Sequence, residues 1–262
     1  MHPFVDSMNR WLHDADKQSG LPEIFNSLRV GAKKRNKHDI KVMRQLSQEL
    51  VEQRRQNPTD NNDLLDALLN QTDPKTGSKL SDASIVDNMI TFLIAGHETT
   101  SGLLSFVFYY MLKNPSALER AQQEVDDVVG TGKLTVDHLS ELKYVNAMLR
   151  ETLRLMPTAP AFTVGALKDD VIGGKFAVKK GEPLNVLLQA AHCDTTVYGP
   201  DASEWKPERM LDEDFKRLPP NSWKPFGNGK RGCIGRAFAW QEALLVSLIY
   251  RHVMAILTCF RL

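Results

Sequence analysis

The sequence lacks the features that mark several common protein classes. Its three cysteines, Cys193, Cys233 and Cys259, lie far apart, and no two of them have the spacing of zinc ligands. An odd number of cysteines also argues against a disulfide framework and favours a reducing compartment. The net charge of only +1 provides no general attraction to nucleic acid or to an anionic membrane surface. We therefore expect no nucleic-acid partner.

Targeting segments and long apolar runs are also missing. The first residues, Met1 to Phe4, contain neither an apolar signal core nor an arginine-rich presequence. The most apolar stretch, residues 89–112, is interrupted by the polar segment 96–100. A charge in the middle of a membrane span is costly, so we expect a buried helix with a functional break and no membrane span. The expected location is the cytoplasm.

Helical patterns fill the first 156 residues. Ser81 is a predicted N-cap, Pro115 a predicted helix start, and Gly130 a predicted helix end. Thr135 is expected to open a short helical turn. The spacing of apolar residues and these boundary signals predict helices over 3–18, 39–56, 62–71, 81–114, 115–130 and 143–156.

The pattern changes after residue 156. Short β-like runs at 162–166, 171–172, 176–178 and 183–188 are separated by glycine-containing turns. Residues 194–225 are predicted to form a long ordered loop, and 235–257 a final helix. The fold class expected is mainly α with a small β region. We divide it into a helix-rich part (1–156), a β and loop part (157–225), and a cysteine loop with the final helix (226–257).

Cys233 lies between glycines at the start of the final helix. The helix N-terminus, Lys230 and Arg231 all favour an anionic sulfur, which is the form that binds a soft metal. One alternative is an inert buried cysteine. Another is a phosphate loop, but Arg231 follows Lys230 where that motif requires serine or threonine. Taken alone, segment 226–235 favours a metal-bound thiolate only moderately.

The polar interruption of the apolar stretch is a second candidate site. The small residues Ala95 and Gly96 would let a flat group approach the helix backbone. Thr99 can bond back to a carbonyl one turn earlier, and Glu98 is an ionisable group suited to proton transfer. The alternative is an ordinary core helix softened by Gly96, whose polar side chains reach solvent or an ion-pair partner.

Glu151 and Arg154 form the third candidate. A spacing of three residues puts both on one helix face, where they can form an ion pair. An isolated surface pair is worth only ~0–1 kcal/mol. By itself this pair indicates an ordinary helical salt bridge.

Together and in this order, these segments resemble the cytochrome P-450 family, the haem-thiolate monooxygenases. Segment 226–235 resembles the haem-binding signature, and segment 95–100 resembles the oxygen-activation motif. Glu151 and Arg154 resemble the family's ion pair, and Arg209 in Pro207-Glu208-Arg209 resembles the arginine that completes it. The resemblance covers essentially the whole chain and implies the fold of this family.

The resemblance also implies roles for individual residues. Cys233 would be the axial ligand of haem b, and Arg231 would pair with a haem propionate. Thr99 would hold the bound oxygen species, and Glu98 would help to deliver protons. Glu151, Arg154 and Arg209 would be structural. The other residues implied at the haem are Phe226, Gly227, Gly235, Ala95 and Gly96; those implied in the substrate pocket are Ala95, Thr158, Ala159 and Pro160.

Segments 92–105 and 157–162 are similar to the self-sufficient fatty-acid hydroxylases, which carry a fused reductase. The implied reaction inserts one atom of O₂ into a lipophilic substrate, with a fatty acid the first candidate. Electrons would come from an NADPH-dependent flavoprotein reductase containing FMN and FAD, which is not part of this chain. Lys206, Lys224 and Lys230 are candidate docking charges for it.

The resemblance has gaps. It begins at the middle helices of the family's domain and stops soon after the last helix, so we expect a fold truncated at the N-terminus and shortened at the C-terminus. Cys193 stands where relatives place a basic residue. One alternative is therefore a non-catalytic haem-binding remnant or an incomplete gene model. A thiol-based redox or phosphate-binding module is weaker, because it leaves Glu98 and Arg154 without a role.

Overall fold

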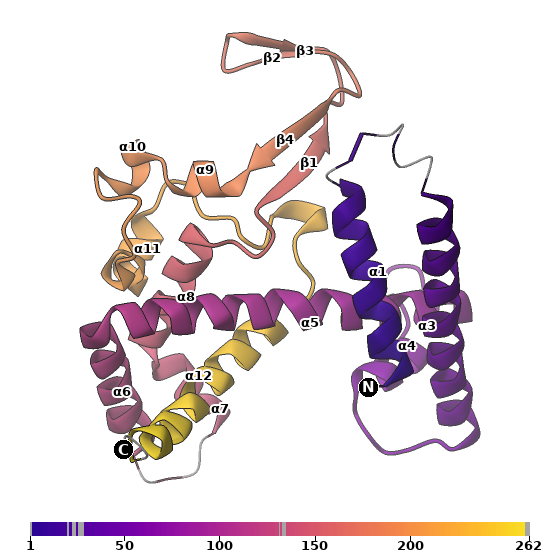
Figure 1. Cartoon of the computed structure of the whole chain (residues 1–262), viewed down its shortest axis with the longest axis horizontal. Helices are drawn as coiled ribbons and strands as arrows, with labels where there is room; N and C mark the ends of the chain where they lie inside the picture. The colour runs from indigo at the N-terminus through magenta and orange to yellow at the C-terminus, as the bar shows by residue number, and fades with distance from the viewer. Residues whose placement is uncertain are drawn as a thin grey trace. The chain divides into compact units, whose positions relative to one another are not determined.

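Helices dominate the computed structural model of the protein, and short antiparallel strands occupy one stretch of the chain (Figure 1). The structure describes residues 2–19, 21–22, 25, 29–130, 132 and 135–259, with only the backbone given for residue 19 and residues 248–259. Gly20, part of the predicted end of the first helix, and the last three residues lie outside the described residues. The chain divides into two compact units, residues 1–95 and 96–262.

The first unit contains α1 (Pro3–Ser19), α3 (Val30–Gln56), α4 (Leu64–Asn70) and the beginning of α5 (Asp82–Lys113). Phe4, Met8 and Met43 form a buried cluster between α1 and α3. Arg10 on α1 donates to the buried carboxylate of Asp39 on α3, with Nε 3.2 Å from Oδ1. An apolar contact and a charge-assisted hydrogen bond thus hold these two helices together.

Helix α3 begins nine residues before its predicted start. The predicted helix opened at Asp39, and the basic run 33–37 before it carries no apolar periodicity. The observed helix opens at Val30 and buries Ala32 and Asp39 on the same side as Met43. Lysine, arginine and alanine are strong helix formers, so this run extends the helix without an apolar stripe of its own.

Most boundary signals in the sequence are confirmed. The Ser84 backbone N–H donates to Ser81 Oγ over 3.3 Å at the start of α5. Gly130 follows α6 (Pro115–Val129) with a φ of +58°, a left-handed conformation that favours glycine. Thr135 caps α7 (Val136–Glu141) in a capping box with His138.

The predicted helix over 81–114 is confirmed to within one residue by α5, but the break predicted inside it is wrong. Helix α5 continues through residues 95–100. The hydroxyl of Ser101 donates to the His97 carbonyl oxygen over 2.7 Å, and that bond leaves the helix intact. The segment is also not buried, since residues 95–99 are exposed and only Thr100 is buried. Among the described residues, no helix is both long enough and apolar enough to cross a membrane.

The second unit is built around α8 (Lys143–Leu155), which is buried on almost every side. Its core joins the C-terminal part of α5, α6, α8 and the first turns of α12 (Arg236–Cys259). The most buried members of this core are Leu142, Met148, Leu149, Leu153, Val107 and Ala243. This central helix therefore provides a rigid base for the polar groups described below.

The β region consists of two antiparallel pairs. Strand β1 (Ala161–Gly165) pairs with β4 (Pro183–Leu187), and β2 (Asp170–Ile172) pairs with β3 (Phe176–Val178). All four strands match predicted runs to within one residue. The β2–β3 turn has Gly173 and Gly174 at φ of +59° and +69°, which side chains other than glycine rarely adopt. The fold is therefore mainly α with a small β region, as the sequence predicts.

The predicted long loop over 194–225 is wrong in part. After α9 (Leu188–His192), this stretch contains α10 (Thr195–Tyr198), the 3₁₀ helix η1 (Pro207–Met210) and α11 (Asp212–Arg217). Each is only four to six residues long, which is too short for an apolar period to appear in the sequence.

Candidate functional site

The loop before α12 is shaped by glycines and closed by backbone hydrogen bonds. Gly227 and Gly229 have φ of +63° and +64°, so a side chain at either position would be strained. The Gly227 N–H donates to the Lys224 carbonyl oxygen over 3.0 Å. The Cys233 N–H donates to the Phe226 carbonyl oxygen over 2.9 Å. These bonds tie both ends of the loop together and fix the backbone that carries Cys233.

Cys233 presents its sulfur at the surface. Its side chain is exposed, and a Cβ atom placed on Gly235 would lie 4.0 Å from Sγ. The alternative of a buried cysteine is therefore wrong. Two apolar side chains beside it are also largely exposed, Ile234 at 85% and Phe238 at 72%. The exposed sulfur therefore lies in a stretch of chain that also exposes two large apolar side chains, just before and within the first turn of α12.

Two tryptophans that the sequence analysis missed hold this loop to α8. The Phe226 ring lies 6.2 Å from the Trp223 ring and 6.0 Å from the Trp240 ring, measured between centroids. Trp223 Nε1 donates to the Arg150 carbonyl oxygen over 3.0 Å, and Trp240 Nε1 donates to Asn146 Oδ1 over 2.7 Å. The signal available in the sequence was a tryptophan on each side of the glycine-rich segment.

The predicted residues on α5 lie on an open stretch of that helix. Ala95, Glu98 and Thr99 are exposed. A Cβ atom placed on Gly96 would meet nothing within 4 Å, so the space in front of it is open. Further along, a Cβ atom on Gly102 would lie 3.3 Å from Thr158 Cγ2, which marks a close approach of two segments.

The predicted pocket residues Thr158, Ala159 and Pro160 connect α8 to β1. Thr158 is half-buried against Gly102, whereas Ala159 and Pro160 are exposed. The Leu188 N–H donates to the Pro160 carbonyl oxygen over 2.8 Å. Residues 158–160 are therefore held at both ends, by α5 and by the start of α9.

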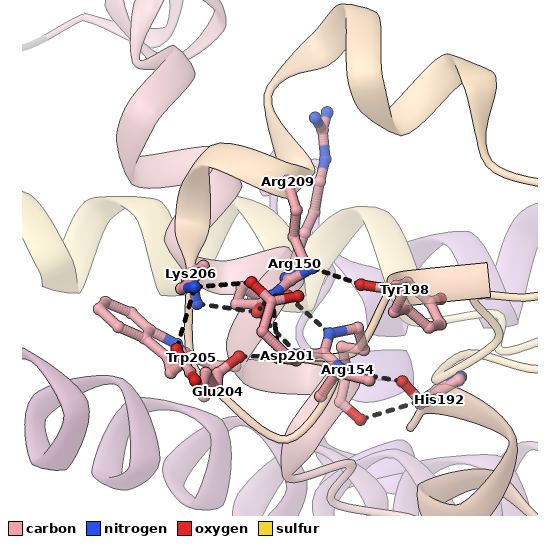
Figure 2. Close-up of polar contacts among 12 residues, drawn as sticks. Arg150, Arg154, His192, Tyr198, Asp201, Glu204, Trp205, Lys206 and Arg209 are labelled. Carbon is pink, nitrogen blue, oxygen red and sulfur yellow. Dashed lines mark hydrogen bonds and ion pairs between the residues drawn. The ribbon is translucent and has the colours of Figure 1, made fainter. Parts of the chain in front are cut away.

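Glu151 and Arg154 form a fully buried ion pair on α8, and Figure 2 shows Arg154 among its other polar partners. Arg154 donates from Nε to Glu151 Oε2 over 2.7 Å and from Nη2 to Glu151 Oε1 over 2.8 Å. Arg209 Nε and the Lys206 backbone N–H also donate to Oε1, over 3.0 and 2.9 Å. The carboxylate thus accepts four hydrogen bonds, which offsets the cost of burying its charge.

The remaining donors of Arg154 all bind backbone oxygens. Nη1 donates to the carbonyls of His192 and Ala202 over 2.7 and 2.6 Å, and Nη2 donates to that of Glu204 over 3.1 Å. A guanidinium has five N–H donors, so every donor of Arg154 has a partner. We call Glu151, Arg154 and Arg209 the α8 hub.

Arg209 connects the α8 hub to the backbone of residues 198–201 (Figure 2). It donates from Nη1 to the Tyr198 carbonyl oxygen over 2.8 Å and from Nη2 to that of Asp201 over 3.1 Å. The Asp201 carboxylate also accepts from Lys206 Nζ over 2.6 Å. The charge of Lys206 is therefore paired, which weakens the prediction that it serves as a docking charge; Lys230 is exposed.

The cations beside Asp201 predict a lowered pKa for its carboxyl group. The Lys206 ammonium, and then Arg209, lower it from 3.8 to about 2. The stabilisation from this carboxylate is thus complete above pH 3.8 and is lost as the pH falls through about 2. We expect a carboxyl NMR titration of Asp201 to have its midpoint near 2, and Lys206→Met to raise it. Lys216→Met, which removes the partner of Glu213 instead, is the control; an unchanged midpoint in Lys206→Met would contradict the assignment.

Within the part of the chain that the structure describes, no three histidine, cysteine or acidic side chains gather in a way that would hold a metal ion. Cys233 therefore belongs to no such cluster among the described residues.

Comparison with known proteins gives a match to the family model described as Cytochrome P450 over residues 1–251. A self-sufficient cytochrome P450 monooxygenase of Exserohilum turcicum is 78% identical over 246 residues, which is 94% of this chain and 23% of that protein. Similarly named proteins of Oidiodendron maius and Penicillium expansum are 59% and 56% identical over 94% and 96% of this chain. The chain spans 23% and 24% of their respective lengths.

Proposed function

The chain belongs to the cytochrome P450 family, and from that premise we propose that it forms part of a haem-dependent monooxygenase. The reaction would insert one atom of O₂ into a lipophilic substrate. Haem b is the cofactor of the family. The observation that carries the proposal is the exposed sulfur of Cys233, held on a hydrogen-bonded loop at the start of α12.

The residues around Cys233 fit a flat apolar group with anionic edges. An exposed thiol can supply one sulfur ligand, and the exposed side chains of Ile234 and Phe238 give it apolar surroundings. Arg231 is exposed and cationic, which suits a carboxylate at the edge of such a group. Gly96 leaves open space in front of α5. These features suit a bound porphyrin.

In this proposal Cys233 would hold the iron, and Arg231 would bind a propionate. Phe226, Gly227 and Gly235 would shape the loop beneath the porphyrin. Bound haem supplies the reductive activation of O₂. The α8 hub would be structural, because it anchors the backbone of residues 192–209 to α8, and Trp223 holds the start of the loop there.

On α5, Thr99 and Glu98 would manage protons. The Thr99 hydroxyl can both donate and accept a hydrogen bond, so it can orient water or a ligand oxygen. The exposed carboxylate of Glu98 can exchange a proton with solvent and pass it along the helix surface.

The relatives' names include "self-sufficient", and this supports an electron source of the flavoprotein type. We propose an NADPH-dependent reductase with FMN and FAD as the donor and a fatty acid as the substrate. Thr158, Ala159 and Pro160 would line the pocket, where their small or apolar surfaces suit an alkyl chain. We also propose a cytoplasmic location.

The proposal is tested by the absorption spectrum of the ferrous carbon-monoxide adduct. After haem is added, the chain is expected to show the red-shifted Soret band of a thiolate-ligated haem. The variant Cys193→Ser removes the other described free thiol and is expected to give the same band. An unshifted band, or no retained haem, would contradict the proposal. With a flavoprotein reductase, ¹⁸O from ¹⁸O₂ should then appear in a hydroxylated fatty acid.

A further inference from the structure

His192 is fully buried at the end of α9, and both of its ring nitrogens have partners. Nδ1 lies 3.1 Å from the carbonyl oxygen of Arg154, which can only accept a hydrogen bond. Nε2 lies 3.0 Å from the backbone nitrogen of Lys224, which can only donate one. The hydrogen must therefore be on Nδ1, and the ring is a neutral imidazole in a single tautomer.

The surroundings of His192 stabilise this neutral form. Burial is the largest cause and lowers the pKa of the imidazole below its ordinary value. The guanidinium of Arg154 acts in the same direction, and its Nη1 donates to the His192 carbonyl oxygen over 2.7 Å. Each of these two residues thus binds the other's backbone carbonyl, so the end of α9 is locked to the end of α8.

Nε2 of His192 connects this pair of residues to the loop that carries Cys233. The Lys224 N–H donates to Nε2 of the imidazole over 3.0 Å. The Lys224 carbonyl oxygen in turn accepts the Gly227 N–H, also over 3.0 Å. Two residues later, the Phe226 carbonyl oxygen accepts the Cys233 N–H over 2.9 Å. A continuous series of hydrogen bonds therefore runs from α8 through His192 to the backbone of Cys233.

We propose that His192 is a positioning residue for the Cys233 sulfur: its imidazole holds residue 224 against α8 and so fixes the start of the loop that presents the thiol. The proposal rests on the proposed function only where bound haem is the readout. Nothing in the apolar pattern of the sequence indicates this role, because both partners are backbone atoms.

Two amide variants separate the two bonds of the imidazole. His192→Asn keeps an N–H group near the position of Nδ1 but is too short to reach Lys224. His192→Gln places its amide oxygen near the position of Nε2, where it can accept the Lys224 N–H. A role in filling space alone predicts similar behaviour of the two variants, whereas the positioning role predicts that they differ.

The first readout is amide hydrogen exchange at Lys224 in the haem-free chain, residues 1–262. A neutral hydrogen bond contributes about 1 kcal/mol, so exchange at Lys224 in His192→Asn should be about fivefold faster than in the wild type. His192→Gln should stay within about twofold of the wild type. Equal exchange in all three proteins, or equally fast exchange in both variants, would overturn the proposal.

The second readout is the thiolate-type Soret band of the ferrous carbon-monoxide adduct. His192→Asn should lose a larger share of this band to the unshifted form than His192→Gln does. If the wild type binds no haem through sulfur, the proposed function fails, and the exchange of Lys224 still decides whether His192 holds the loop. If the wild type shows the band and both variants match it, the positioning role is overturned.

Discussion

Replacing Arg154 by methionine is expected to lower the free energy of unfolding by about 3–5 kcal/mol. The change leaves the Glu151 carboxylate buried without its bidentate partner. It also removes the donors to three backbone carbonyls, those of His192, Ala202 and Glu204. Urea unfolding followed by tryptophan fluorescence measures the loss, because Trp205, Trp223 and Trp240 all lie in the same unit.

Two further variants make this prediction specific. Arg154→Lys keeps the positive charge but has no planar fork to bind the carboxylate and the carbonyls together, so it should restore only part of the stability. Lys216→Met breaks an exposed pair with Glu213 and should change the stability far less. A loss in Arg154→Met no larger than that in Lys216→Met would show that the buried pair does not stabilise the fold.

Unlike Arg154→Met, replacing Cys233 by serine is expected to change the free energy of unfolding little but to abolish the ligation of haem by sulfur. The side chain is exposed, and the loop is held by backbone bonds that serine preserves. The red-shifted Soret band should be lost completely, because a serine hydroxyl does not replace a thiolate as a soft ligand. Absorption spectroscopy of the reduced carbon-monoxide adduct measures this.

The matched control is Cys193→Ser, at the half-buried cysteine next to His192. It should keep the shifted band, since the His192 ring and not the Cys193 thiol binds Lys224. Retention of the band in Cys233→Ser, or its loss in Cys193→Ser, would contradict the assignment of Cys233 as the sulfur ligand.

Local signals in the sequence predict much of the fold. Pro115, Gly130 and Thr135 each mark a boundary through backbone geometry or capping that depends on neighbouring residues only. The early start of α3 was missed because its first residues include a run of lysine and arginine that forms helix without an apolar stripe. The Arg10–Asp39 contact, which spans 29 residues, also leaves no trace in a local apolar pattern.

The sequence predicts which residue types form the candidate site, but not the contacts that hold them in place. The spacing of Glu151 and Arg154 indicates an ion pair, yet that spacing is the same for a surface pair and a buried one. The partners that distinguish the two cases are carbonyl oxygens 38 to 50 residues away. Every residue has such an oxygen, so no residue type identifies these partners. His192, Trp223 and Trp240 were missed as supports for a related reason, because their contacts with α8 depend on the folded path of the chain.

The binding of Arg154 to backbone carbonyl oxygens has an evolutionary consequence. Its guanidinium recognises main-chain oxygens at residues 192, 202 and 204, so substitutions at those positions preserve its partners. An insertion or deletion of a single residue between positions 192 and 204 would instead shift one carbonyl out of register with the others. Related sequences should therefore keep the length of this interval constant even where the side chains at positions 202 and 204 differ.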